Sequence, residues 1–126
     1  MGALRDMETF PPLGGHQADT QSYRIVCPIG ASGATGTLTK HPAGVAIAKN
    51  GTGIYDCTGL PITAAGAGQF YFGIYSPGSP PTVGSAVVTS VSLTAGTMTF
   101  KTLVGVTVTE PASGDIITIF FVGEGG

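Results

Sequence analysis

The chain has 126 residues, of which only 10% are charged and 42% are hydrophobic, and it contains 21 glycines and no tryptophan. The length predicts one domain, and the few scattered basic residues argue against a surface for nucleic acid. There is no apolar run of membrane-spanning length and no signal-peptide pattern, so we expect neither a membrane span nor export. Because so little charge solvates the surface, the composition favours a subunit of an assembly.

The first twenty residues show no hydrophobic period, and prolines and glycines interrupt them. We expect an extended N-terminal arm over residues 1–20 and a single β-sandwich domain over residues 21–126. The arm could be a disordered tail or a segment that docks on a neighbouring subunit, and we favour docking. Its candidate contact residues are Leu4, Phe10 and Leu13.

The first strand is predicted over residues 23–29, where apolar and other residues alternate before the glycine-rich turn Gly30–Gly33. The segment Thr35–Lys40 then predicts a short polar strand at a sheet edge. Further on, Asn50-Gly51 lies between two strand-like runs, which predicts a hairpin with a type I′ turn. Such a turn would place Ile47 opposite Ile54.

An aromatic strand is predicted over residues 69–76. Phe70, Phe72 and Ile74 fall on one side of this strand, and Tyr71 and Tyr75 fall on the other.

The proline-rich segment that follows cannot form the interior of a strand, so we expect a loop at the end of the sheets. Loops of this kind often carry contacts. The candidate contact residues of this loop are Pro77, Pro80, Pro81 and Val83.

The last third, residues 85–122, predicts three strands joined by two tight turns. Within residues 97–109 the even positions carry most of the large apolar side chains, which predicts one buried face, and Gly105 predicts a bend or bulge. Residues 115–122 are apolar on both faces, so this strand should lie centrally in a sheet or face another subunit. About eight strands and no helix favour an all-β, jelly-roll-like sandwich. The even-position residues are Met98, Phe100, Val104, Val106 and Val108.

The two cysteines, Cys27 and Cys57, are interpreted as buried thiols that act as small hydrophobic residues. A structural disulfide and a metal or redox role are the alternatives.

No catalytic or metal-binding constellation emerges from the sequence. His16 and His41 have no second ligand at metal spacing, and nothing brings Asp56 and Asp115 together. Asp115 follows a glycine and should accept hydrogen bonds from turn amides. We therefore expect no enzyme, no cofactor and no metal.

Several segments occur in an order that resembles small β-sandwich virion proteins of tailed bacteriophages, particularly marine ones, which decorate heads or belong to tails. They are Tyr23–Val26, Gly53–Asp56, the hairpin Ser92–Thr99, and Pro111–Asp115 before an apolar last strand, and the resemblance covers roughly residues 22–122. The chain departs from such proteins in its two cysteines and its glycine-rich end.

The resemblance implies a structural virion protein, and specifically a capsid decoration (cement) protein that binds and stabilises the assembled head. Its partner would be the major capsid protein or another virion protein, and it would form a homo-oligomer such as a trimer. It would act in the virion, which is assembled in the host cytoplasm, without binding nucleic acid or membrane. One alternative is a tail or fibre protein. Another is a carbohydrate-binding sandwich module that exposes Tyr55, Tyr71 or Tyr75 in a row, although the absence of tryptophan weighs against it.

Overall fold

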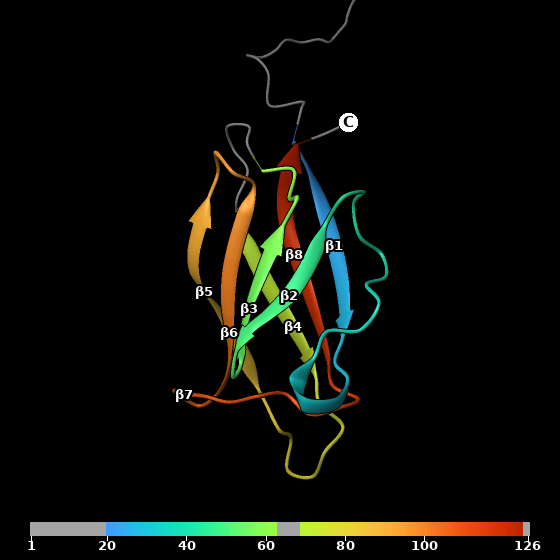
Figure 1. Ribbon diagram of the computed structural model, residues 1–126, viewed down its shortest axis with the longest axis vertical. Helices are drawn as coiled ribbons and strands as arrows, with labels where there is room; N and C mark the ends of the chain where they lie inside the picture. The colour runs from blue at the N-terminus through green and yellow to red at the C-terminus, as the bar shows by residue number, and fades with distance from the viewer. Residues whose placement is uncertain (1–19, 63–68, 125–126) are drawn as a thin grey trace, which may run out of the picture.

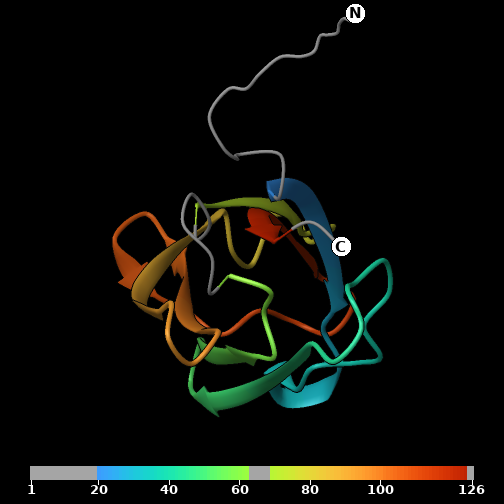
Figure 2. The same ribbon diagram turned by 90° about the horizontal axis from the view of Figure 1, so that it is seen from above.

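The computed structural model describes residues 20–62 and 69–124, and these form an all-β sandwich, as predicted. Two antiparallel sheets pack face to face (Figures 1 and 2). The arm contacts expected at Leu4, Phe10 and Leu13, and His16, lie outside the described residues. The described strands are β1 (Thr20–Pro28), β2 (Ala46–Gly51), β3 (Ile54–Thr58), β4 (Phe70–Tyr75), β5 (Ser85–Ser92), β6 (Thr97–Val104), β7 (Thr107–Val108) and β8 (Ile116–Glu124), with a 3₁₀ turn η2 (Ala31–Gly33) after β1.

The smaller sheet has the order β1-β8-β4, so the last strand lies in its centre. This confirms the prediction from a strand that is apolar on both faces. The larger sheet has the order β2-β3-β6-β5, and β7 pairs with the end of β6. Consequently β5 and β6 belong to the larger sheet and β8 to the smaller one. The strands in the last third of the chain therefore do not all pair in sequence order within one sheet.

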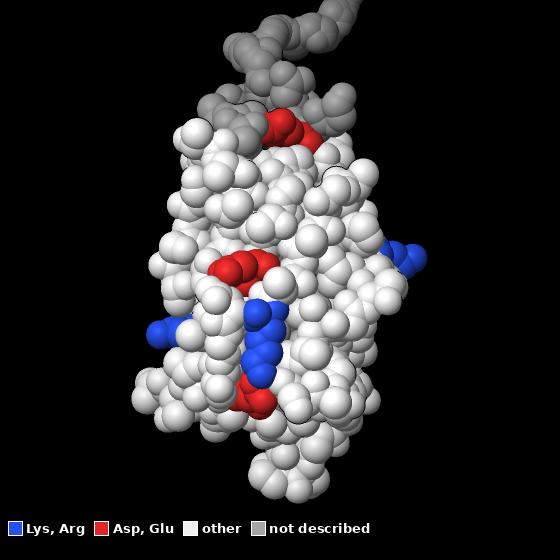
Figure 3. Space-filling model, viewed as in Figure 1, with Lys and Arg blue, Asp and Glu red and all other residues white. Residues whose placement is uncertain are grey.

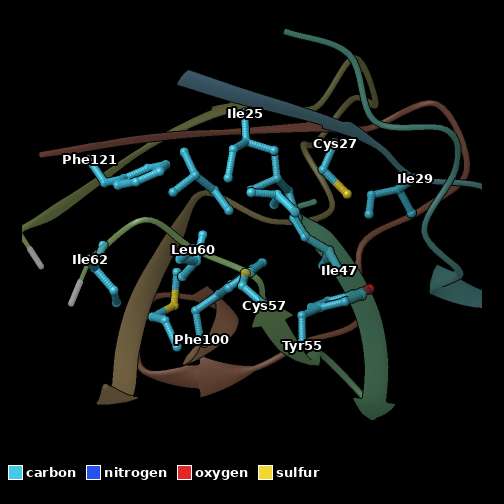
Figure 4. Close-up of a cluster of buried hydrophobic side chains, with 14 residues drawn as sticks. Ile25, Cys27, Ile29, Ile47, Tyr55, Cys57, Leu60, Ile62, Phe100 and Phe121 are labelled. Atoms are coloured by element: carbon cyan, nitrogen blue, oxygen red, sulfur yellow. The ribbon is translucent and has the colours of Figure 1, made fainter. Parts of the chain in front are cut away.

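The core lies between the sheets and is filled by alternate residues of the strands (Figure 4). The ring centroids of Phe72 in the smaller sheet and Phe100 in the larger sheet lie 5.1 Å apart. Tyr55 stacks on the same Phe100 ring at 5.4 Å. Tyr55 and Phe100 are register partners within the larger sheet, so of the two ring contacts it is the one between Phe72 and Phe100 that joins the layers. Fully burying a side chain of this size contributes about 1.5–3 kcal/mol.

The hairpin between β2 and β3 differs from the prediction. Ile47 pairs with Cys57 rather than with Ile54, because a bulge lies between Lys49 and Gly51 and moves the turn two residues along. Gly53, with φ +69°, now provides the left-handed conformation. Its carbonyl accepts a hydrogen bond from the backbone of β6, so pairing with a neighbouring strand outweighs the local preference of Asn-Gly.

The strand that begins at Thr97 ends at Val104, close to the bend that Gly105 predicted. The chain reverses there, with Gly105 at φ +61°, and Val104 pairs with Thr107 across the new turn. Thr102 is still buried, but the even positions beyond it do not continue the buried face: Val106 is 95% exposed, and Val104 and Val108 are exposed as well. The prediction that these three valines are buried was wrong. The chain turns back after Val104, so the residues after the turn keep the alternating pattern but no longer face the core.

The segment predicted as a polar edge strand, Thr35–Lys40, forms no strand. It runs beside β1 and makes two isolated bridges, from Thr35 to Ile29 and from Thr39 to Val26. It therefore covers part of the edge of β1 with few regular hydrogen bonds.

Candidate functional site

The outer face of the smaller sheet exposes a group of large aromatic side chains. The alternation of β4 points Tyr71 and Tyr75 outward, with 64% and 59% of their surfaces exposed. The strand register places Tyr71 beside Phe120 on β8, which is 43% exposed, and Phe120 beside Arg24 on β1. Tyr75 lies beside Ile116 in the same way. We call these five residues the aromatic face: Arg24, Tyr71, Tyr75, Ile116 and Phe120.

The aromatic face offers two kinds of contact. Its rings can bury large apolar areas against a partner, while the tyrosine hydroxyls and the Arg24 guanidinium supply polar contacts at the edge. Between the tyrosines, Gly73 has no side chain and pairs with Thr118, which leaves a low strip between two raised rings. Soluble monomers rarely expose contiguous apolar patches unless they bind something.

The loop between β4 and β5 contains the predicted contact prolines. Pro77, Pro80 and Pro81 are exposed, so they remain available to a partner. Val83 is only 1% exposed, and its assignment as a contact residue was wrong. The chain comes back to the body of the sandwich at the end of this loop, before β5 begins, and the Val83 side chain is buried there.

A buried carboxylate holds this loop in place. Asp115 is almost fully buried and accepts hydrogen bonds of 2.9 Å from the Ser76 hydroxyl and from the Ala112 backbone N–H. The Ser76 hydroxyl in turn accepts one of 2.9 Å from the backbone N–H of Thr82. The contact with Ala112 confirms the predicted turn role of Asp115, and the rest of the network fixes both ends of the proline loop.

An ion pair lies near the same end of the sandwich. Lys49 on β2 contacts the carboxylate of Glu110 and donates a hydrogen bond of 2.6 Å to the carbonyl of Ser32. It thus connects η2, β2 and the segment before β8. Both side chains are about one-third exposed, so we assign the pair a modest stabilising role of about 1 kcal/mol or less.

Tyr55 does not join an exposed aromatic row, contrary to the arrangement expected for a carbohydrate-binding module. Its side chain is fully buried in the core. Burial, together with the nearby Glu110 carboxylate and Cys27 thiol, raises the pKa of the Tyr55 phenol to about 12. Tyr55 is therefore a neutral core residue at physiological pH.

Both cysteines are buried and free, in the sites expected of small hydrophobic residues. Burial raises the pKa of the Cys27 thiol to about 11 and, with the effects of Cys27 and Asp56, that of the Cys57 thiol to about 12. Since the thiolate is the reactive form, neither side chain has the character of a nucleophile.

Over residues 20–62 and 69–124, no three His, Cys, Asp or Glu side chains gather closely enough to hold a metal ion. His41 is exposed and lies 2.7 Å, through its Nδ1, from the carbonyl oxygen of Pro42. Asp56 on β3 and Asp115 before β8 belong to opposite sheets and do not pair. The described part of the chain also has no helix that is long and apolar enough to cross a membrane.

Charged side chains are few and scattered on the face that carries the larger sheet (Figure 3). No protein-family model, no curated protein and no solved structure matches this chain. The aromatic face, the proline loop and this weakly charged surface are therefore the features from which a function must be argued.

Proposed function

We propose that this chain is a structural protein of a tailed-bacteriophage particle, and that it acts as a capsid decoration protein on the assembled head. The observation that carries the proposal is the aromatic face, which lies on a sandwich with very few charges. Such a surface is more typical of a protein that stays bound to another protein than of one that is a free monomer in solution. The order of turn motifs described above supports the phage assignment.

The mechanism of decoration would be thermodynamic. Tyr71, Tyr75 and Phe120 project from two strands that are paired with each other, so little backbone entropy is lost when a partner covers them. Each such side chain can contribute about 1.5–3 kcal/mol when fully buried. A protein that binds only the assembled shell stabilises that shell by mass action, and copies placed across subunit junctions would oppose their separation.

The smaller sheet alone offers a limited contact area, because it has only three strands. Stable protein interfaces bury about 800 Å² on each partner. We therefore propose that the proline loop, with Pro77, Pro80 and Pro81, and the N-terminal arm enlarge the contact. A homo-oligomer such as a trimer would increase the area further and bind the shell through several copies at once.

The test measures occupancy of heads assembled without this protein. The double substitution Tyr71→Ser and Phe120→Ser should weaken binding by about a hundredfold, since two large apolar contacts are lost. Val106→Ser is the control, because Val106 is also an exposed apolar residue but lies on the β6–β7 turn. Equal occupancy for all three proteins, at equal thermal stability, would remove the aromatic face from the interface.

A tail or fibre protein remains the alternative within the same class. Electron microscopy with a labelled copy of the chain separates the two proposals, because the label would then appear on the tail and not on the head.

The second candidate function is carbohydrate binding, which one specific observation favours. Tyr71 and Tyr75 are exposed on one strand, about 13 Å apart at about 3.3 Å per residue. Rings so placed can stack on separate units of a sugar chain. A soluble polysaccharide that quenches tyrosine fluorescence, and does so less in Tyr75→Ser, would support this function over decoration.

A further inference from the structure

The outer face of the larger sheet contains a hollow of about 380 Å³. It lies over β3 and β6, on the opposite side of the sandwich from the aromatic face. Five of its lining residues carry polar side chains, and its floor includes Cys57 and Met98, which are buried. The five polar residues are Asn50, Asp56, Thr58, Thr97 and Thr99, and we call the cavity that they line the polar hollow.

The strand register explains why these side chains converge. Asp56 on β3 is directly opposite Thr99 on β6, and the Thr99 hydroxyl donates a hydrogen bond of 2.7 Å to Oδ1 of Asp56. Thr58 and Thr97 continue the same outward positions one step further along the two strands. Asn50 reaches the hollow from the bulge at the end of β2. The carboxylate is therefore held in one orientation by a neighbouring strand.

The donors and acceptors of the polar hollow define a ligand class. A carboxylate accepts several hydrogen bonds, threonine hydroxyls donate and accept, and the asparagine amide does both. Such a set matches a ligand with several neighbouring hydroxyl groups. A volume near the lower end of the range for ligand pockets, about 300–1,000 Å³, suits a small ligand.

A cationic ligand fits less well. Lys101 lies two residues after Thr99 on the same strand face, and the register places it diagonally from Asp56, at about 7–8 Å between backbones. Its ammonium group offsets the field of the single carboxylate, so little net charge remains to attract an amine or a guanidinium.

We propose that the polar hollow binds a sugar unit through its hydroxyl groups. Asp56 accepts from two adjacent hydroxyls of the ligand while keeping its bond to Thr99, and Asn50, Thr58 and Thr97 contact the remaining ones. This site is independent of the aromatic face. On a decorated particle with the aromatic face against the shell, the polar hollow would face outward and could meet a glycan.

The test is a titration of the full chain, labelled with ¹⁵N, with a panel of methyl glycosides and disaccharides of common hexoses. Saturable shifts of the backbone amides around Asp56 and Thr99 are expected for at least one probe. Asp56→Asn should weaken that binding about tenfold, because it keeps an acceptor for Thr99 but removes the charge and the second acceptor oxygen.

A matched pair of threonine variants tests the hydroxyl contacts. Thr97→Val removes a hydroxyl inside the hollow and should weaken binding several-fold, whereas Thr107→Val removes one on β7 outside it and should not. The proposal is overturned if no sugar produces saturable shifts or if the shifts map to Tyr71 and Phe120. It is also overturned if methylguanidinium or a primary amine binds instead of the sugars.

Discussion

The buried phenol of Tyr55 donates a hydrogen bond of 2.6 Å to the backbone carbonyl oxygen of Gly33, 22 residues earlier in the chain. This contact joins β3 to the turn that follows β1. Because both groups are removed from water, the bond satisfies a carbonyl that would otherwise be buried without a partner.

Tyr55→Phe should therefore lower the free energy of unfolding by about 1–3 kcal/mol, because it leaves the Gly33 carbonyl unsatisfied. Tyr75→Phe is the control, since that hydroxyl belongs to an exposed side chain and its loss should change stability by less than about 0.5 kcal/mol. Urea unfolding of both variants measures the difference. Identical midpoints would show that the Tyr55–Gly33 bond contributes nothing.

Gly53→Ala tests the turn between β2 and β3. A Cβ atom at Gly53 would lie 2.8 Å from the carbonyl oxygen of Thr109, in addition to the strain of φ +69°. Gly105→Ala is the matched control, because Gly105 has φ +61° and open space around it. Gly105→Ala should lower the free energy of unfolding by about 1–2 kcal/mol, because of the left-handed conformation alone. Gly53→Ala should lower it by clearly more, because its Cβ atom is also crowded. A smaller loss for Gly53→Ala, in thermal melts, would contradict the crowding at this turn.

Three buried groups predict a loss of stability at alkaline pH. Unfolded thiols titrate near 9 and the unfolded phenol near 10, whereas the folded pKa values of Cys27, Cys57 and Tyr55 are about 11, 12 and 12. Between these values the unfolded chain has released protons that the folded chain still holds. The free energy of unfolding should therefore fall as pH rises above about 9.

Melting temperatures measured from pH 7 to pH 11 test this dependence. The double substitution Cys27→Ala and Cys57→Ala should be less stable at neutral pH, because it leaves cavities, yet lose less stability between pH 9 and pH 10. Parallel curves for the two proteins would mean that the thiols titrate normally in the folded state.

Deletion of residues 1–18 should leave the sandwich folded, because every residue of the described core cluster lies outside that segment. Occupancy of the phage head should fall if Leu4, Phe10 and Leu13 contribute apolar contacts. A full-length variant with serine at these three positions separates lost contacts from lost length. Unchanged occupancy for both variants would show that the arm makes no contact with the head and that the interface lies on the sandwich.

Local alternation was sufficient to predict the strands whose two faces meet different surroundings. The alternation around Phe72 separated the two sides of β4, and the structure packs the side with Phe72 against the core and exposes the side with Tyr71 and Tyr75. The apolar character of both faces of β8 predicted either a central position or a face turned to another subunit, and the strand order shows the central position. These inferences succeed because the period of a strand is a property of its own backbone.

The remaining errors arise where a distant segment decides the outcome. Asn50-Gly51 has the sequence of a type I′ turn, but the pairing of Gly53 with Thr102 selects another turn. Val83 follows a proline loop and is nevertheless enclosed by the core. The polar hollow requires Asp56 and Thr99, which are 43 residues apart, to meet across two strands, and no local pattern gives their register.

The first and last described strands are direct neighbours, with Thr20 paired to Glu124 at one end of the sandwich and the β4–β5 loop at the other (Figure 1). Their hydrogen bonds run perpendicular to the strands. A force that separates the two ends of the chain would therefore open the nine residue pairs of β1 and β8 one after another. A force between the end of β8 and the β4–β5 loop would instead load the six residue pairs of β4 and β8 together. The same molecule should thus be weak when it is pulled by its ends and strong when it is pulled along its length.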